Sequence, residues 1–134
     1  MNKVPVTIIA GFLGSGKTTL LNHVLTSEHG LKIAVLVNDF GEINIDSQLI
    51  TNVEGETISL ANGCVCCTIR DDLARAVREL VDSGENYEYI ITETSGVSEP
   101  AAAVMGLVMP PDLSAKIQID AIITVVDAEQ VLEL

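Results

Sequence analysis

The sequence is poor in aromatic and basic residues. It contains no tryptophan, two phenylalanines and two tyrosines, and its 7 Lys and Arg residues face 19 Asp and Glu residues, giving a net charge of −12. Because nucleic acids and anionic membranes attract proteins mainly through Lys and Arg, this balance disfavours non-specific binding to either. We therefore expect a protein that binds no nucleic acid.

Long hydrophobic runs and scattered cysteines are also missing. No run approaches 18 apolar residues, so no segment is predicted to span a membrane. The start of the chain, residues 1–10, lacks the charged and long apolar regions of a signal peptide. The three cysteines all lie within residues 64–67. An odd cysteine count without a secretory signal favours the cytoplasm, where thiols stay reduced.

Aliphatic and β-branched residues are abundant, and apolar runs alternate with amphipathic ones. This alternation predicts one α/β domain over residues 1–134, with crossover connections and a mostly parallel sheet. The expected strands are residues 4–10, 33–37, 56–60, 87–92 and 119–126, and the expected helices are residues 17–28, 71–82 and 101–109. The expected loops are residues 11–16, 38–55, 61–67, 93–100 and 110–118.

The segment "GFLGSGKT" fits the phosphate-loop pattern G-x-x-x-x-G-K-S/T and lies between a predicted strand and a predicted helix. Glycines let backbone N–H groups point inward, and the helix N-terminus favours phosphate. Lys17 would reach the β- and γ-phosphates, and Thr18 would bind Mg²⁺. The alternative is a chance glycine-rich turn. The predicted nucleotide-binding residues here are Gly11, Gly14, Ser15, Gly16, Lys17, Thr18 and Thr19.

A second segment, "YIITETSG", is an apolar strand that ends in Glu93 and is followed by Gly96. A carboxylate at this position can hold Mg²⁺ or orient the attacking water, and a glycine N–H can contact the γ-phosphate. The alternative for Glu93 is a solvated strand end. We predict that Lys17, Glu93 and Gly96 are the catalytic residues of a nucleotide hydrolase.

Four segments together, "GFLGSGKTTLLNH", "NDFGEINID", "GCVCC" and "ETSGVSEP", resemble the CobW-type metallochaperone GTPases. The resemblance runs from about residue 6 to residue 127 and implies the three-layer fold of a P-loop NTPase. It implies GTP and Mg²⁺ as ligands, with Asp39 near the Mg²⁺ site where many members have Glu. It further implies a metal site formed by Cys64, Cys66, Cys67 and Glu42.

Two features of that family are missing from the sequence. No N-K-x-D segment, which reads the guanine base in the family, is present, and the family's second, C-terminal domain does not follow. We therefore expect the N-terminal portion of a GTPase domain, truncated before the guanine-specificity segment. A preference for GTP over ATP rests on the resemblance alone.

The cysteine cluster admits several interpretations. Residues 68–71 resemble a capping box, so we expect a helix to begin just after Cys67 and to favour its thiolate, the form that binds metal. Three cysteines leave a tetrahedral Zn²⁺ site one ligand short, which Glu42 or a water could complete. Redox chemistry and a closed structural zinc site are the alternatives. His23 and His29 are predicted to be helix-surface or helix-end residues rather than ligands.

The favoured hypothesis is a GTP-dependent metallochaperone that binds zinc and transfers it to a client metalloprotein. GTP hydrolysis would be coupled to this transfer. Co²⁺ and Ni²⁺ would suit similar ligands. Nucleotide would order residues 38–46 and bring Glu42 toward the cysteines, and a homodimer is left open. The rival functions are a small-molecule kinase or ATPase with the same phosphate loop, and a non-enzymatic module that stores or senses metal.

Overall fold

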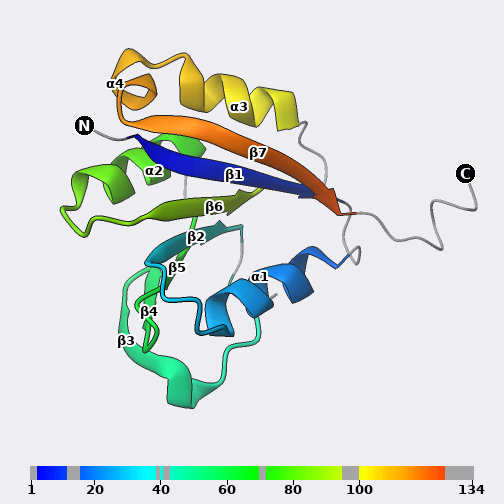
Figure 1. The fold of residues 1–134 in the computed structure, drawn as a ribbon, viewed down its shortest axis with the longest axis vertical. Coiled ribbons are helices and arrows are strands. Elements are labelled where there is room, and N and C mark those ends of the chain that lie inside the picture. Colours follow the sequence, from blue (N-terminus) through cyan, green and yellow to red (C-terminus); the bar gives the residue numbers. More distant parts are fainter. Residues whose placement is uncertain are drawn as a thin grey trace, which may run out of the picture.

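A computed structural model describes residues 3–11, 16–38, 40, 43–69, 72–94 and 100–125. Its strands form one sheet in the order β3-β4-β5-β2-β6-β1-β7, with helices on both faces (Figure 1). The strands are β1 (Val4–Gly11), β2 (Ile33–Val37), β3 (Ile50–Glu54), β4 (Thr57–Leu60), β5 (Val65–Thr68), β6 (Tyr89–Glu93) and β7 (Ile117–Val125). The helices are α1 (Lys17–Thr26), α2 (Leu73–Asp82), α3 (Pro100–Val108), α4 (Pro111–Ser114) and the 3₁₀ turn η2 (Ser47–Leu49).

Strand β1 lies inside the sheet, between β6 and β7. It pairs in parallel with both, so that Ile8 is opposite Thr92 on one side and Ile122 on the other. Strands β2, β5 and β6 continue the parallel part. The predicted α/β fold with a mostly parallel sheet and an interior first strand is therefore confirmed. Because β1 is covered on both faces, an unbroken apolar sequence suits it.

Alternate residues of the strands pack into two hydrophobic clusters on opposite faces of the sheet. The cluster beneath α2, α3 and α4 contains Val6, Ile8, Leu36, Val77 and Leu107. The cluster beneath α1 contains the strand residues that point to the other face, among them Ile9, Val35 and Ile91. They pack with Leu21 and Leu25 of α1. The sheet thus separates an α1 face from an α2–α4 face, which gives the three layers.

Four elements lie in predicted loops or overlap them by three or more residues. Strand β3 and the 3₁₀ turn lie within residues 38–55, and α4 lies within residues 110–118. Strand β5 covers the last three residues of the predicted loop 61–67 and extends to Thr68. Strand β3 is mostly exposed at the sheet edge, so its sequence carries little hydrophobic signal. The capping box predicted for residues 68–71 is wrong: Thr68 ends β5, and the side chain of Asp72 caps α2 by accepting from Ala74 N at 3.0 Å.

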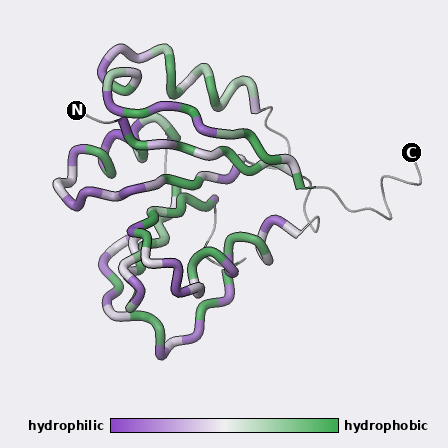
Figure 2. Tube along the Cα trace, in the orientation of Figure 1, coloured by the Kyte–Doolittle hydropathy of each residue, from purple (hydrophilic) through white to green (hydrophobic). Residues whose placement is uncertain are grey.

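The helices differ strongly in polarity. Helix α2 has one buried apolar stripe and an outer charged face, whereas α3 carries no charged residue and is hydrophobic along most of its length (Figure 2). Only Leu107 of α3 is buried, and Met105 and Val108 are exposed. In the part of the chain that the structure describes, no helix combines the length and apolar character needed to cross a membrane.

Candidate nucleotide site and cysteine motif

The carboxyl ends of β2, β6 and β1 lie side by side at the edge of the sheet where α1 begins (Figure 1). Gly16, the residue before α1, has φ of 104°, and a Cβ atom there would lie 3.4 Å from Val125 Cγ1. An L side chain is strained at this φ, so the turn into α1 favours glycine. In open parallel sheets ligands bind at this edge, where the phosphate loop was predicted.

Lys17 opens α1 and is almost completely buried, with 7% of its surface exposed. Its amine donates a hydrogen bond to the carbonyl oxygen of Thr94 at 3.4 Å, the long end of the normal range. A lysine is rarely buried this deeply unless an anion or other strong partner compensates the lost hydration. The burial of Lys17 therefore fits a place for phosphate.

Glu93 ends β6 and has 3% of its surface exposed. Its Oε1 accepts a hydrogen bond from the backbone N–H of Asn38 at 2.8 Å. The alternative interpretation of Glu93 as a solvated strand end is wrong, because the carboxylate is buried and directed toward the end of β2. Thr18 and Glu93 carry oxygen atoms of the kind that Mg²⁺ prefers as ligands. Thr18 lies at the start of α1 and Glu93 at the end of β6, and these two elements meet at this edge.

Thr94 belongs to the same site, although it was not among the residues predicted from the sequence. Its backbone N–H donates to Ile9 O at 2.9 Å, and its carbonyl accepts from Lys17. Its hydroxyl is buried and has no hydrogen-bond partner among the residues that the structure describes. The only sequence signal was its place between Glu93 and Gly96. The predicted residues Gly14, Ser15, Asp39, Glu42 and Gly96 lie outside the described residues.

The cysteines lie in and beside a buried strand rather than in a loop. Cys66 and Cys67 belong to β5, which pairs with both β4 and β2, and Cys64 directly precedes it. Successive side chains of a strand point to opposite faces. Cys64 and Cys66 accordingly pack on the α1 face, and Cys67 packs on the α2 face. The three thiols do not converge on one point.

Burial keeps these thiols protonated. Burial, together with smaller contributions from the negative charges of Cys67 and Glu93, raises the pKa of Cys66 to about 12. Burial also raises the pKa of Cys64 and of Cys67. The thiolate expected from a helix N-terminus is wrong for the metal-free chain, because α2 begins only at Leu73 and desolvation dominates.

His29 lies close to Cys64, with 3.7 Å between Nε2 and Sγ, but its ring is held by the backbone. Its Nδ1 accepts a hydrogen bond from Leu31 N, and its Nε2 lies 3.0 Å from Val24 O. Since Nδ1 is an acceptor, Nε2 carries the proton and is not free to bind metal. Within the described ranges, no three His, Cys, Asp or Glu side chains are placed to hold one metal ion.

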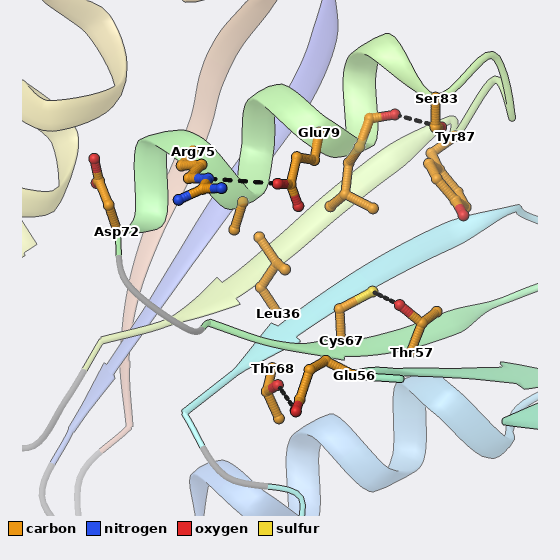
Figure 3. A pocket seen from close by; sticks show the side chains of 12 residues that line it. Leu36, Glu56, Thr57, Cys67, Thr68, Asp72, Arg75, Glu79, Ser83 and Tyr87 are labelled. Atoms are coloured by element: carbon orange, nitrogen blue, oxygen red, sulfur yellow. Dashed lines mark hydrogen bonds and ion pairs between the residues drawn. The ribbon is translucent and has the colours of Figure 1, made fainter. Parts of the chain in front are cut away.

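A cavity of about 400 Å³ lies on the α2 face of the sheet, between β4, β5 and α2 (Figure 3). Cys67 points into it, and Cys67 Sγ lies 3.5 Å from the Thr57 hydroxyl. The wall carries the carboxylates of Glu56, Asp72 and Glu79. Cys67 is 8% exposed, whereas Cys64 and Cys66 are fully buried, so the cavity is the side from which solvent reaches the motif.

Residues 5–134 match the family described as "CobW/HypB/UreG, nucleotide-binding domain". This chain belongs to that family. It is 42% identical to zinc-regulated GTPase metalloprotein activator 1 of Dictyostelium discoideum, with 98% of this chain and 31% of the relative covered. It is 41% identical to zinc chaperone CobW of Pseudomonas aeruginosa (96% and 36% covered) and 37% identical to zinc chaperone YjiA of Escherichia coli (96% and 42% covered).

Solved structures agree with this assignment. The Zn(II)-bound YjiA GTPase from E. coli superimposes with a TM-score of 0.74 at 36% identity, covering 92% of this CobW/HypB/UreG domain and 40% of that chain. A Zn(II)-bound triple mutant of YjiA, in which one glutamate and two cysteines are replaced by alanine, gives a TM-score of 0.75. The fold is that of a P-loop NTPase, and the chain spans 31% to 42% of the length of these three curated relatives.

Proposed function

We propose that this chain is the nucleotide-binding part of a cytoplasmic metallochaperone that hydrolyses GTP and delivers zinc to a client metalloprotein. The observation that carries the proposal is the closeness of two sites on strands that are separated only by β2. The buried Lys17, Glu93 and Thr94 lie at one edge of the sheet, and the cysteine strand β5 lies beside β2, whose end Glu93 contacts. The zinc and GTPase names of the relatives support it.

For the nucleotide, Lys17 would neutralise the β- and γ-phosphates, and Thr18 with Glu93 would hold Mg²⁺. The Mg²⁺ ion would supply charge neutralisation of the phosphates. Glu93 is also suited to orient water, because its carboxylate is fixed by Asn38 N. Gly96 and Asp39 would complete the site. The choice of GTP over ATP is supported by the GTPase relatives.

For zinc as cargo, Cys66 is the central thiol, with Glu42 as the proposed oxygen ligand. Cys64 lies on the same α1 face, whereas Cys67 lies across the sheet. One ion could bind Cys66 together with Cys67 only if residues 65–68 departed from strand geometry. Binding through Cys64 and Cys66 needs no such change. Glu93 links the two sites, because the residue it holds, Asn38, begins the segment that leads to Glu42.

The decisive test is a titration of the reduced chain with Co²⁺, in which binding is measured by the thiolate charge-transfer absorption. The titration is done without nucleotide, with GTP and Mg²⁺, and with ATP and Mg²⁺. We expect one ion per chain and an affinity that depends on GTP more than on ATP, since coupling between sites is reciprocal. Cys66→Ser/Cys67→Ser should erase the band, and Glu42→Ala should weaken its nucleotide dependence. If Co²⁺ affinity did not change with nucleotide, the chain would instead be a metal-storage module. If ATP changed the Co²⁺ affinity as much as GTP does, the proposed preference for GTP would be wrong.

A further inference from the structure

The sulfur of Cys64 is enclosed by the loop that joins α1 to β2. Cys64 is fully buried, with 0% of its surface exposed. Its thiol donates a hydrogen bond to Leu31 O at 3.6 Å, and His29 Nε2 lies 3.7 Å from its Sγ. The sulfur therefore has a carbonyl acceptor on one side and a ring nitrogen on another, both supplied by the same loop.

The backbone fixes the imidazole of His29 in one tautomer. Nδ1 accepts a hydrogen bond from Leu31 N at 3.0 Å, so in the neutral ring Nε2 carries the hydrogen. This N–H has two acceptors within reach, Val24 O at 3.0 Å and Cys64 Sγ at 3.7 Å. Because backbone groups hold both ring nitrogens, the N–H stays beside the sulfur of Cys64.

The charge of the sulfur decides which acceptor this N–H prefers. A neutral thiol is a weak acceptor, so the carbonyl of Val24 is the better partner in the metal-free chain. A cysteine sulfur that binds a metal ion has released its proton and is anionic. Hydrogen bonds to ionised groups are about twice as strong as neutral ones. The sulfur that His29 faces therefore becomes the stronger competitor for the N–H when it binds metal.

We propose that His29 is a positioning residue of the metal site, and that its Nε2–H donates to Cys64 Sγ when this sulfur binds zinc. The inference rests on the proposed function, in which Cys64 and Cys66 bind the ion from the α1 face. The Cys64 proton passes to water as the bond between sulfur and zinc forms. The N–H···S hydrogen bond then fixes the direction of the sulfur and offsets part of the cost of a negative charge buried away from water.

The test compares His29→Phe with the parent chain, each reduced and titrated with Co²⁺. The phenyl ring is similar in size to imidazole but has no N–H. A hydrogen bond to a thiolate lowers the energy of the sulfur electrons, so its loss should shift the charge-transfer band to longer wavelength. Co²⁺ affinity should fall roughly 10- to 100-fold, which is the usual effect of removing a group that holds a metal ligand in place.

Matched variants separate this role from a structural one. His29→Gln keeps an N–H donor and should retain much of the affinity and of the band position. His23→Phe replaces the other histidine of the chain, which is exposed on α1, and should leave both unchanged. In a Cys64→Ala background, His29→Phe should have no further effect on Co²⁺ binding, because the acceptor sulfur is gone.

Nitrogen-15 NMR of the Zn²⁺-loaded parent adds a measurement that needs no substitution. We expect His29 Nε2 to keep its hydrogen; a metal-bound Nε2 would make His29 a ligand and overturn the inference. An unchanged band in His29→Phe, or the same loss of affinity with and without Cys64, also overturns it and leaves the proposed function intact. A parent chain that shows no thiolate charge-transfer band with Co²⁺ overturns both.

Discussion

Single residues in this chain owe their chemistry to burial as much as to identity. Lys17 and Glu93 could be predicted from the sequence, because each stands at a fixed position of a recurrent nucleotide motif. The contact between the Lys17 amine and the carbonyl oxygen of Thr94 could not be predicted, because it depends on how the end of β6 packs against the start of α1. The same holds for the cysteines: the sequence predicted their metal-binding role, whereas their protonation depends on a strand buried on both faces.

The raised pKa values of the thiols lead to a prediction about their reactivity. The thiolate is the nucleophile, so a buried thiol whose pKa lies well above neutral reacts slowly. In the reduced, metal-free chain we expect reaction with Ellman's reagent at pH 7.5 to be roughly tenfold or more slower than in urea. Below its pKa of about 12, Cys66 gains thiolate as pH rises, so its rate should climb without a plateau through pH 9.

Cys67 should react first, because it is the cysteine that faces the cavity between β4, β5 and α2. Cys67→Ser should therefore remove the fastest phase and leave two slower thiols, whereas Cys64→Ser should leave the fastest phase unchanged. Three thiols that react together at the rate of a free cysteine would contradict the burial of β5.

At the scale of elements, the cysteine strand is tied to α1 by one side chain. The amide nitrogen of Asn62 donates to Leu25 O at 2.8 Å and to Ser27 O at 3.0 Å, near the end of α1. Its amide oxygen accepts from Cys64 N at 3.0 Å. Asn62 thus joins carbonyls left unpaired by the helix end to the start of β5.

We predict that Asn62→Ala lowers the free energy of unfolding by about 2 kcal/mol, because it leaves three partly buried backbone groups without their partner. Urea denaturation followed by circular dichroism measures this change. Asn52→Ala, on the exposed edge strand β3, is the matched control and should stay within about 0.5 kcal/mol of the parent. Equal stability of the two variants would show that water replaces the Asn62 contacts at no cost.

The elements that could be predicted from the sequence are those with a clear pattern of apolar residues. The apolar runs of β1 and β2 and the amphipathic pattern of α2 are recognisable without knowledge of their neighbours. Strand β3 was missed because its exposed residues need no apolar alternation, and β5 was missed because its cysteines were interpreted as a metal-binding loop. Pairing of β5 with β2 and β4 depends on long-range contacts that local sequence does not encode.

Across the whole molecule, one sheet carries both the proposed nucleotide edge and the cysteine motif. Between β6 and β5 lies only β2, and Glu93 holds Asn38, the first residue after β2. The proposed coupling would therefore run from Glu93 through Asn38 to the segment that precedes Glu42. The net charge of −12 disfavours anion binding in general, whereas Lys17 places a buried positive charge where phosphate is proposed to bind.

This buried charge predicts that nucleotide stabilises the whole domain through Lys17. A ligand that binds only the folded chain, present at about 100 times its Kd, raises the free energy of unfolding by about 2.7 kcal/mol. We expect GTP with Mg²⁺ to raise the urea midpoint of the parent accordingly and to have no such effect on Lys17→Ala. The matched control is Lys116→Ala, which removes an exposed lysine paired with Asp82 and should keep the full shift. If Lys17→Ala were stabilised as much as the parent, nucleotide would bind elsewhere, because no cation of the phosphate loop would then be contributing.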